Sequence, residues 1–206
     1  MKVTVIGGTG YVGLVTGIGL ACKGNQVICA DIDSAKIEQL KDGRIPIHEE
    51  GLSDLLASAQ KNGRITFTDC IESAVKASGI IILTVGTPEN KHGDADLSQM
   101  VKAVKIIANN INSHKTIVVK STVPVGTCEM LAAFIRENLK SSRFTFDIVS
   151  NPEFLREGSA VNDFMSPDRI VVGTGSGQAA RVMRDLYGPF GAAVVMTDIR
   201  SSEMIK

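Results

Sequence analysis

The 206-residue chain carries 22 basic and 22 acidic side chains, and this balance gives it no electrostatic footprint for nucleic acid. A hydrophobic fraction of 44% beside a charged fraction of 21% excludes wholesale disorder. The four cysteines lie far apart without a C-x-x-C pair and the three histidines are isolated, which argues against a disulfide scaffold or a metal site and fits a reducing cytoplasm.

Residues 3–22 carry no charge, and a stretch of twenty is long enough to suggest a membrane span or a signal peptide. Six glycines would weaken a spanning helix, and a single Lys2 precedes the stretch. The stretch also divides into a β-rich run, a glycine turn and a helical pattern. We therefore expect no membrane partner and a cytoplasmic protein.

Short β-rich runs alternate with segments of helical period along the chain. Residues 80–83 are apolar at every position, as a strand covered on both faces requires. This alternation predicts an α/β fold, a Rossmann-like, doubly wound and mostly parallel sheet with helices on both faces. The predicted strands span 2–6, 26–30, 65–68, 80–85, 116–120, 146–149, 169–172 and 193–196, and the predicted helices 11–23, 34–41, 51–61, 70–77, 97–111, 125–140 and 178–187.

The end of the chain predicts one more helix. Ser202 is a candidate N-cap and Glu203 a suitable first-turn residue, yet the sequence stops at Lys206, about one turn later. A domain seldom ends on a nucleated helix. We therefore expect a domain over residues 1–200, a truncated helix over 201–206, and a chain that is a fragment of a longer protein.

Gly8-Thr9-Gly10-Tyr11-Val12-Gly13 is a G-x-G-x-x-G pattern between the first predicted strand and helix. The first glycine permits a tight turn, the second lets the backbone approach a pyrophosphate, and the third allows close packing of helix on strand. The helix N-terminus supplies N–H donors to the phosphates. The pattern predicts dinucleotide binding; the alternative is a glycine turn that serves only packing.

Asp31 ends the second predicted strand, where a carboxylate accepts hydrogen bonds from the adenosine ribose hydroxyls. The same charge repels the 2′-phosphate of NADP, so NAD is favoured. Lys36 complicates this prediction because it can lie near the same site. Asp33 is interpreted as the cap of the following helix.

Three further strand ends carry polar motifs, VGTP at 85–88, KSTVP at 120–124 and SNPEFLREG at 150–158. Each has a structural alternative, since Thr122 and Asn151 can cap helices and Glu153 and Glu157 would share one face of a helix. Their recurrence after successive strands favours a site at the carboxyl edge of the sheet.

Together these residues closely resemble the amino-terminal domain of the UDP-glucose 6-dehydrogenases, within the nucleotide-sugar dehydrogenase family that includes GDP-mannose dehydrogenase. The resemblance covers essentially the whole chain and rests on VIGGTGYVG, VGTPENKHGDADLS, KSTVPVGT, SNPEFLREGSAVNDFMSPDRIVVG and the terminal SSEMIK. It implies the four-electron oxidation of the C6 alcohol of UDP-glucose to the carboxylate of UDP-glucuronate, with reduction of two NAD, through a thiohemiacetal and a thioester on a cysteine.

The resemblance also implies residue roles. Glu153 would act as acid/base in thioester hydrolysis, Thr122 would help to position the water, and Lys206 would stabilise the oxyanion. The positions implied for NAD are Gly8, Gly10, Tyr11, Val12, Gly13, Asp31, Lys36, Thr87, Thr122 and Glu157. Those implied for the sugar nucleotide are Glu153, Phe154, Leu155, Arg156, Glu157 and Lys206.

The chain departs from the family because it has no GGxCxPKD-like segment with the catalytic cysteine. Its own cysteines are interpreted as small buried side chains: Cys22, Cys29, Cys70 and Cys128. We therefore expect a chain that binds NAD without oxidising UDP-glucose by itself. The parent enzyme is expected to be a homodimer or larger, whereas the oligomeric state of the fragment, including a monomer, stays open, with exposed apolar surface expected at 199–205.

Three alternatives stay open. The nucleotide sugar can be GDP-mannose or another relative of UDP-glucose. A 3-hydroxyacid-type NAD-dependent dehydrogenase would leave the NPEFLREG run unexplained and would need a later catalytic His or Lys. A non-enzymatic module that senses redox state through its nucleotide would need a natural chain end at Lys206.

Overall fold

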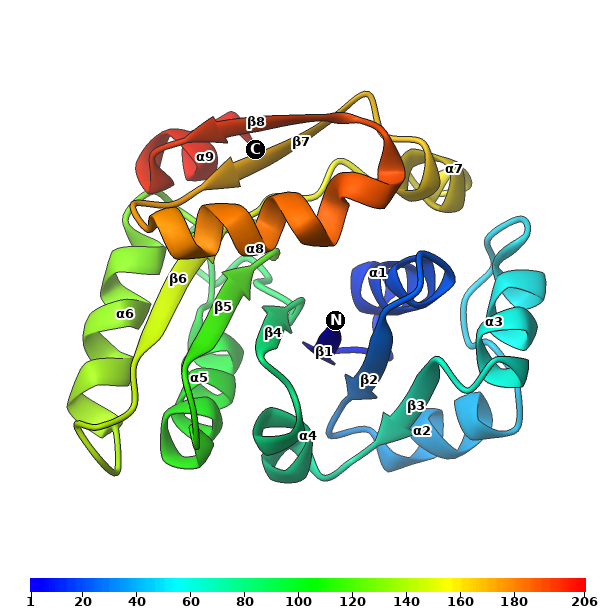
Figure 1. Cartoon of the computed structure of the whole chain (residues 1–206), viewed down its shortest axis with the longest axis horizontal. Helices are drawn as coiled ribbons and strands as arrows, with labels where there is room; N and C mark the ends of the chain where they lie inside the picture. Colours follow the sequence, from blue (N-terminus) through cyan, green and yellow to red (C-terminus); the bar gives the residue numbers. More distant parts are fainter.

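One eight-stranded sheet runs through the computed structural model, which describes residues 1–206, in the order β3-β2-β1-β4-β5-β6-β7-β8 (Figure 1). All neighbouring pairs are parallel except β6 and β7, which meet antiparallel at Ser150 and Gly173. The mostly parallel sheet predicted from the sequence is confirmed. The strands are β1 (Lys2–Ile6), β2 (Gln26–Ala30), β3 (Ile65–Thr68), β4 (Ile80–Leu83), β5 (Lys115–Val119), β6 (Phe146–Ser150), β7 (Arg169–Gly173) and β8 (Ala193–Thr197).

Helices cover both faces of this sheet, and a separate apolar core lies on each face. Ile80 and Ile82 face the core under α1, α2, α3, α7 and α8, whereas Ile81 and Leu83 face the core under α4, α5 and α6. This double burial explains why β4 has no polar residue. The helices are α1 (Tyr11–Cys22), α2 (Ser34–Lys41), α3 (Leu52–Lys61), α4 (Ile71–Ala77), α5 (Ser98–Asn110), α6 (Thr127–Asn138), α7 (Ala160–Met165), α8 (Gly177–Tyr187) and α9 (Ile199–Ile205), with a 3-10 turn at Gly188–Phe190.

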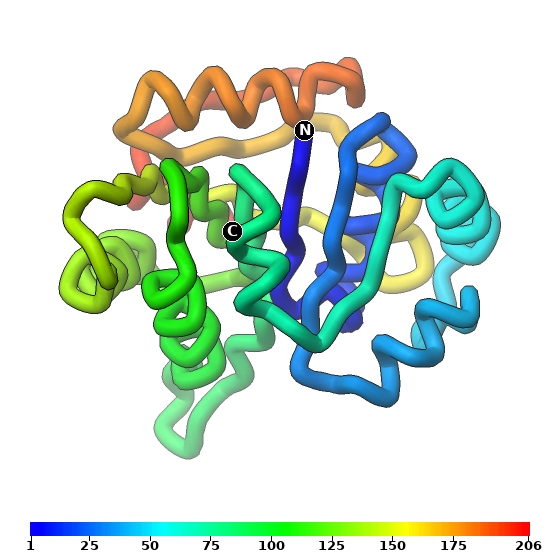
Figure 2. Tube along the Cα trace, turned by 60° about the horizontal axis from the view of Figure 1, so that its bottom comes forward, coloured from blue at the N-terminus to red at the C-terminus, as the bar shows by residue number.

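The uncharged stretch 3–22 forms β1, the glycine turn and α1, and Figure 2 shows this dark-blue first strand between β2 and β4. Residues 13–21 of α1 are all buried, so the stretch is apolar because it lies in the centre of the fold. None of the helices combines the length and the apolar character needed to cross a bilayer.

All eight predicted strands and all seven helices predicted before the last one are confirmed, with end points that differ by a few residues at most. The chain contains two short elements that the sequence did not predict, α7 and the turn at Gly188–Phe190. The capping roles considered for Thr122 and Asn151 are not found. Gly126, at φ +93°, precedes α6, and Asn151 is buried, donating to the Val171 carbonyl at 2.7 Å and accepting from the Tyr187 hydroxyl at 2.6 Å.

The last helix begins at Ile199 rather than near Ser202, because Asp198 is its N-cap and accepts from the Ser201 N–H at 2.9 Å. Ser202 is fully buried instead, and its hydroxyl donates to the Ser150 carbonyl at 3.2 Å. Glu203 lies beyond the first turn and accepts N–H groups from another helix, α6.

The NPEFLREG run is not helical. Residues 151–159 form an irregular connection, which we call the 151–159 loop, between β6 and α7. The suggestion that Glu153 and Glu157 share a helix face is therefore wrong. The loop follows the carboxyl end of β6 directly, which places it at the same edge of the sheet as the glycine turn.

Candidate functional site

The turn after β1 depends on glycine at several positions. The tight turn was predicted at Gly8, but the residue with the left-handed backbone is Gly7, at φ +82°. The N–H groups of Gly7 and Gly8 both donate to the Ala30 carbonyl, at 3.0 and 3.1 Å. A Cβ on Gly8 would lie 2.8 Å from the Cα of Cys29, and one on Gly13 would lie 2.1 Å from the Gly7 carbonyl oxygen. The close packing predicted for the third glycine is confirmed.

The first turn of α1 opens on Gly10, which has no side chain to cap the helix. The first N–H groups of a helix have no partners within it, so those of α1 are donors for an anion, in the field of the helix dipole. A Cβ on Gly10 would lie 3.3 Å from the Gly7 carbonyl oxygen, so even alanine at this position would be crowded against the turn.

A cleft of about 640 Å³ lies beside this turn, between the carboxyl ends of β1 and β4 where the chain crosses from one side of the sheet to the other. Gly7, Thr9 and Gly10 line it together with the ends of β2 and β4 and with one face of α5. The volume is within the range of about 300–1,000 Å³ typical of ligand pockets.

Asp31 lines the cleft, and its Oδ2 accepts from the Thr9 N–H at 3.1 Å and from the Thr9 hydroxyl at 2.7 Å. Lys36 also lines it, with Nζ 3.3 Å from Oδ2 of Asp33, which caps α2 as predicted. Sequence reasoning missed Ile32, whose side chain is 83% exposed in the same cleft. A lone apolar residue after the acidic strand end is the available signal.

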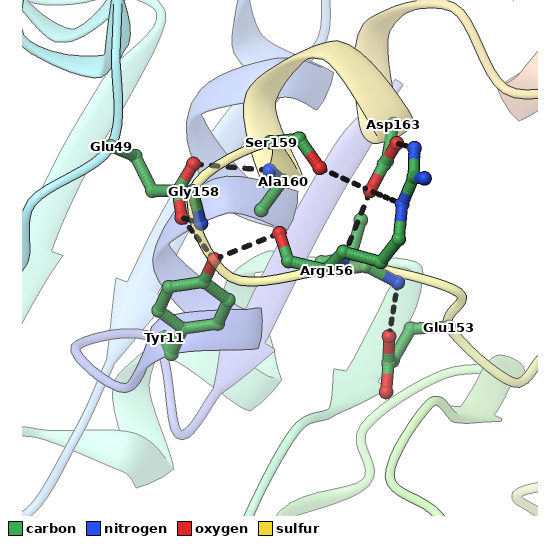
Figure 3. Close-up of polar contacts among 9 residues, drawn as sticks. Tyr11, Glu49, Glu153, Arg156, Gly158, Ser159, Ala160 and Asp163 are labelled. Atoms are coloured by element: carbon green, nitrogen blue, oxygen red, sulfur yellow. Dashed lines mark hydrogen bonds and ion pairs between the residues drawn. The ribbon is translucent and has the colours of Figure 1, made fainter.

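Other predicted cofactor residues lie outside this lining. Tyr11 does not line the cleft. Its hydroxyl donates to Glu49 and lies 3.3 Å from the Arg156 carbonyl oxygen (Figure 3). Val12 does not line the cleft either, and the Thr87 hydroxyl donates to the Thr122 carbonyl at 2.7 Å. The VGTP and KSTVP motifs are thus in contact with each other.

A second, small cavity of about 40 Å³ brings together the residue that follows β5, the 151–159 loop, α7 and β7. Glu153 borders it, and its Oε1 lies 2.8 Å from Nζ of Lys206 while its Oε2 accepts from the Leu155 N–H at 2.5 Å. Phe154 packs beside this pair, with the Lys206 ammonium 5.7 Å from its ring centre. The structure thus joins three of the predicted substrate residues, although Lys206 is distant in sequence.

Lys120 borders the same cavity and was not predicted as a site residue. It is 5% exposed, and no hydrogen bond or ion pair holds its ammonium group, which lies 5.8 Å from the Phe164 ring centre. Burial lowers the pKa of Lys120 to about 8, against the opposing charge of Glu153. A lysine directly after an apolar strand is the signal in the sequence.

Arg156 and Glu157 do not line this cavity. The Arg156 guanidinium forms two hydrogen bonds with Asp163, at 2.6 and 3.2 Å, and this contact lowers the pKa of Asp163 to about 2. Glu157 is exposed. The structure therefore brings Glu153, Phe154 and Leu155 to the cavity but not the next two residues of the loop.

None of the four cysteines lines either cavity. Cys29 and Cys128 are buried, as interpreted from the sequence, and burial raises the pKa of Cys29 to about 12. Cys22 is half-buried, but Cys70 is exposed before α4, so the buried interpretation is wrong for that residue. A thiol that stays protonated is a poor nucleophile, so Cys29 is unsuited to covalent catalysis.

Comparisons with known proteins identify the family of the chain. Residues 1–191 match the model of the UDP-glucose/GDP-mannose dehydrogenase family, NAD binding domain. The whole chain is 50% identical to the UDP-glucose 6-dehydrogenase TuaD of Bacillus subtilis and spans 44% of that protein. Among solved structures, a UDP-glucose dehydrogenase from Pyrobaculum islandicum matches 99% of the chain with a TM-score of 0.95 at 38% identity, and the match covers 48% of that chain.

A GDP-mannose dehydrogenase from Pseudomonas aeruginosa, solved as a ternary complex, matches the whole chain with a TM-score of 0.95 at 33% identity and is covered over 48% of its length. The chain thus spans about half the length of the relatives that it matches. Since the family model covers nearly the whole chain, the protein belongs to the UDP-glucose/GDP-mannose dehydrogenase family and corresponds to its NAD binding domain.

Proposed function

We propose that this chain binds NAD in the cleft of about 640 Å³ and forms the cofactor half of a UDP-glucose 6-dehydrogenase. The observation that carries the proposal is the juxtaposition of the glycine turn, the uncapped N-terminus of α1 and the Asp31 carboxylate in one cleft. A turn that served only packing would not need an acidic side chain hydrogen-bonded to Thr9 beside an open cleft.

The residues present fit a dinucleotide. The N–H groups of the first turn of α1 would hold the pyrophosphate, and Asp31 would accept from the adenosine ribose, with exposed Ile32 as an apolar surface for the base. Bound NAD supplies the hydride acceptor. Lys36 is already engaged with Asp33, which favours a ribose without a 2′-phosphate.

Glu153 and Lys206 would serve the sugar nucleotide. A carboxylate 2.8 Å from an ammonium group can exchange a proton with a nearby water, while the ammonium stabilises a developing oxyanion. Thr122 lies exposed shortly after the end of β5, and its carbonyl accepts from the Thr87 hydroxyl. This position would suit contact with the nicotinamide side of the cofactor. None of the four cysteines of this chain would serve as the nucleophile of the reaction, because none of them lines either the cleft or the cavity beside Glu153.

GDP-mannose is the second candidate substrate, and the structural match to a GDP-mannose dehydrogenase is the observation that favours it. UDP-glucose is preferred because the sequence identity of 50% is to a UDP-glucose 6-dehydrogenase.

Amide-resolved NMR titration of the 15N-labelled chain tests both parts of the proposal. NAD should shift the amides of Gly8, Gly10 and Asp31. UDP-glucose, added to the NAD-saturated chain, should shift the amide signals of the 151–159 loop and of Lys206 at a lower concentration than GDP-mannose does. If NAD shifts only amides on other surfaces, the cofactor assignment is contradicted. If GDP-mannose shifts the amides of the loop at a lower concentration than UDP-glucose does, the substrate assignment is reversed.

A further inference from the structure

Glu49 is a buried acidic side chain that lines neither of the two cavities. It lies in the connection between α2 and α3, is 7% exposed, and has no cationic partner. Its carboxylate accepts from the Gly158 N–H at 2.6 Å, from the Ala160 N–H at 3.0 Å and from the Tyr11 hydroxyl (Figure 3). Burial alone would raise the pKa of Glu49, but these donors outweigh it and the pKa is lowered, so the group is a carboxylate at neutral pH.

The partners of Glu49 belong to the two halves of the proposed site. Tyr11 is the first residue of α1, next to Gly10 in the cleft, whereas Gly158 lies in the 151–159 loop, and Ala160 opens α7. The same Tyr11 hydroxyl lies 3.3 Å from the Arg156 carbonyl oxygen. Glu49 and Tyr11 are therefore a direct polar connection from the glycine turn to the loop that carries Glu153.

We propose that Glu49 is a positioning residue that couples occupancy of the dinucleotide cleft to the placement of the 151–159 loop, with the Tyr11 phenol as the link. The inference rests on the proposed NAD binding. A ligand that fixes the first turn of α1 fixes Tyr11 with it, and so stabilises the Glu49 carboxylate in the position that holds Gly158 and Ala160. The loop then presents Glu153 to the sugar nucleotide more rigidly when the cofactor is bound.

A second carboxylate offers a matched comparison. Asp163 holds the opposite side of the same loop, accepting from the Arg156 N–H at 2.9 Å and from the Ser159 hydroxyl at 3.2 Å. It forms no hydrogen bond with Tyr11 or with α1, so it supports the loop without a polar connection to the cleft (Figure 3). Removing Asp163 should loosen the loop equally with and without cofactor.

The test is hydrogen exchange of single amides, followed by NMR, with NAD as the probe. In the unchanged chain, saturating NAD should slow exchange of the Gly158 and Ala160 N–H groups about fivefold or more. Tyr11→Phe removes only the linking hydroxyl, so NAD should still bind, within about threefold of its affinity, while the slowing falls below about twofold. Glu49→Gln should abolish it as well. Asp163→Asn should speed exchange but preserve the response to NAD.

The outcomes separate the two proposals. Absence of NAD binding by the unchanged chain would overturn the proposed function. Binding without any slowing at Gly158 and Ala160, or the same slowing in Tyr11→Phe as in the unchanged chain, would overturn the coupling and leave Glu49 as a cap of α7 alone. If Glu49→Gln fails to fold, Tyr11→Phe decides, because it leaves both backbone hydrogen bonds of Glu49 in place.

Discussion

The carboxylate of Asp31 lies at the carboxyl end of β2, where Oδ2 accepts from Thr9 and Oδ1 accepts from the Asp33 N–H at 3.3 Å. These contacts orient the side chain before any ligand arrives. An oriented charge beside a ribose discriminates between a hydroxyl, which donates to it, and a phosphate, which it repels.

Asp31→Asn should therefore weaken NAD about tenfold, from the loss of about 1.4 kcal/mol in charge-assisted hydrogen bonding, and should remove the preference over NADP. Titration with both nucleotides measures this effect. Asp69→Asn is the matched control, because Asp69 is an exposed acid at the same edge of the sheet, one strand further on, outside the cleft. A retained preference for NAD in Asp31→Asn would show that another group selects the cofactor.

Lys120 gives a prediction about stability. Its pKa is about 8 in the fold, below the ordinary lysine value of about 10.4, so between these values the unfolded chain binds more protons and stability rises with pH. The ammonium is thus destabilising below pH ~8 by about 3 kcal/mol.

Lys120→Met should raise the free energy of unfolding at neutral pH, and this gain should shrink by about 3 kcal/mol as the pH rises from ~8 to ~10.5. Denaturant unfolding of both proteins at several pH values measures the difference. Lys102→Met, at a lysine on α5 outside this cavity, controls for general loss of charge. A gain that does not change with pH would contradict the buried ammonium as its source.

At the scale of whole elements, α9 is attached to α6 by one carboxylate. Glu203 is 5% exposed and accepts from the Gly126 N–H at 2.6 Å and the Cys128 N–H at 2.7 Å, which satisfies the open N-terminus of α6. The motif that ends the chain thus acts as a tertiary cap on a helix that begins 76 residues before it, at Thr127.

Glu203→Ala should destabilise the chain by about 2 kcal/mol, since it leaves buried N–H groups without acceptors at a positive helix end. Arg200→Ala removes an exposed ion pair between the same two helices, in which the guanidinium lies 2.7 Å from Glu129, and should change the stability much less because solvent screens the pair. Chemical denaturation of the two variants compares them directly. Equal losses would mean that Glu203 contributes only surface charge.

These elements also show what could be predicted from the sequence. Continuous apolar runs such as β4 and the glycine turn before α1 are local signals, and they predicted the strands, most helices and the cleft with Asp31. Six-residue α7 depends on contacts that are distant in sequence, from Glu49 to the N–H of Ala160. The start of α9 was misplaced because Asp198 and Ser202 are both good caps, and only the burial of Ser202 against β6 decides between them.

At the scale of the molecule, the sheet is parallel, as predicted, from β3 to β6, and the strand direction then reverses. Strand β7 pairs antiparallel with β6, and the Tyr187 hydroxyl of α8 donates to the side chain of Asn151, the residue that follows β6. Hydrophobic patterning gives no strand direction, so this reversal was not predictable. Glu49 and Lys120 escaped prediction for a related reason, since their significance comes from side chains that the fold brings together.

Calorimetric titration of the chain with NAD, and separately with NADP, tests most directly whether the cleft beside Asp31 is a cofactor site. We expect saturable binding of one NAD per chain and binding of NADP weaker by about tenfold or more. No binding of either nucleotide, or tighter binding of NADP, would contradict the assignment.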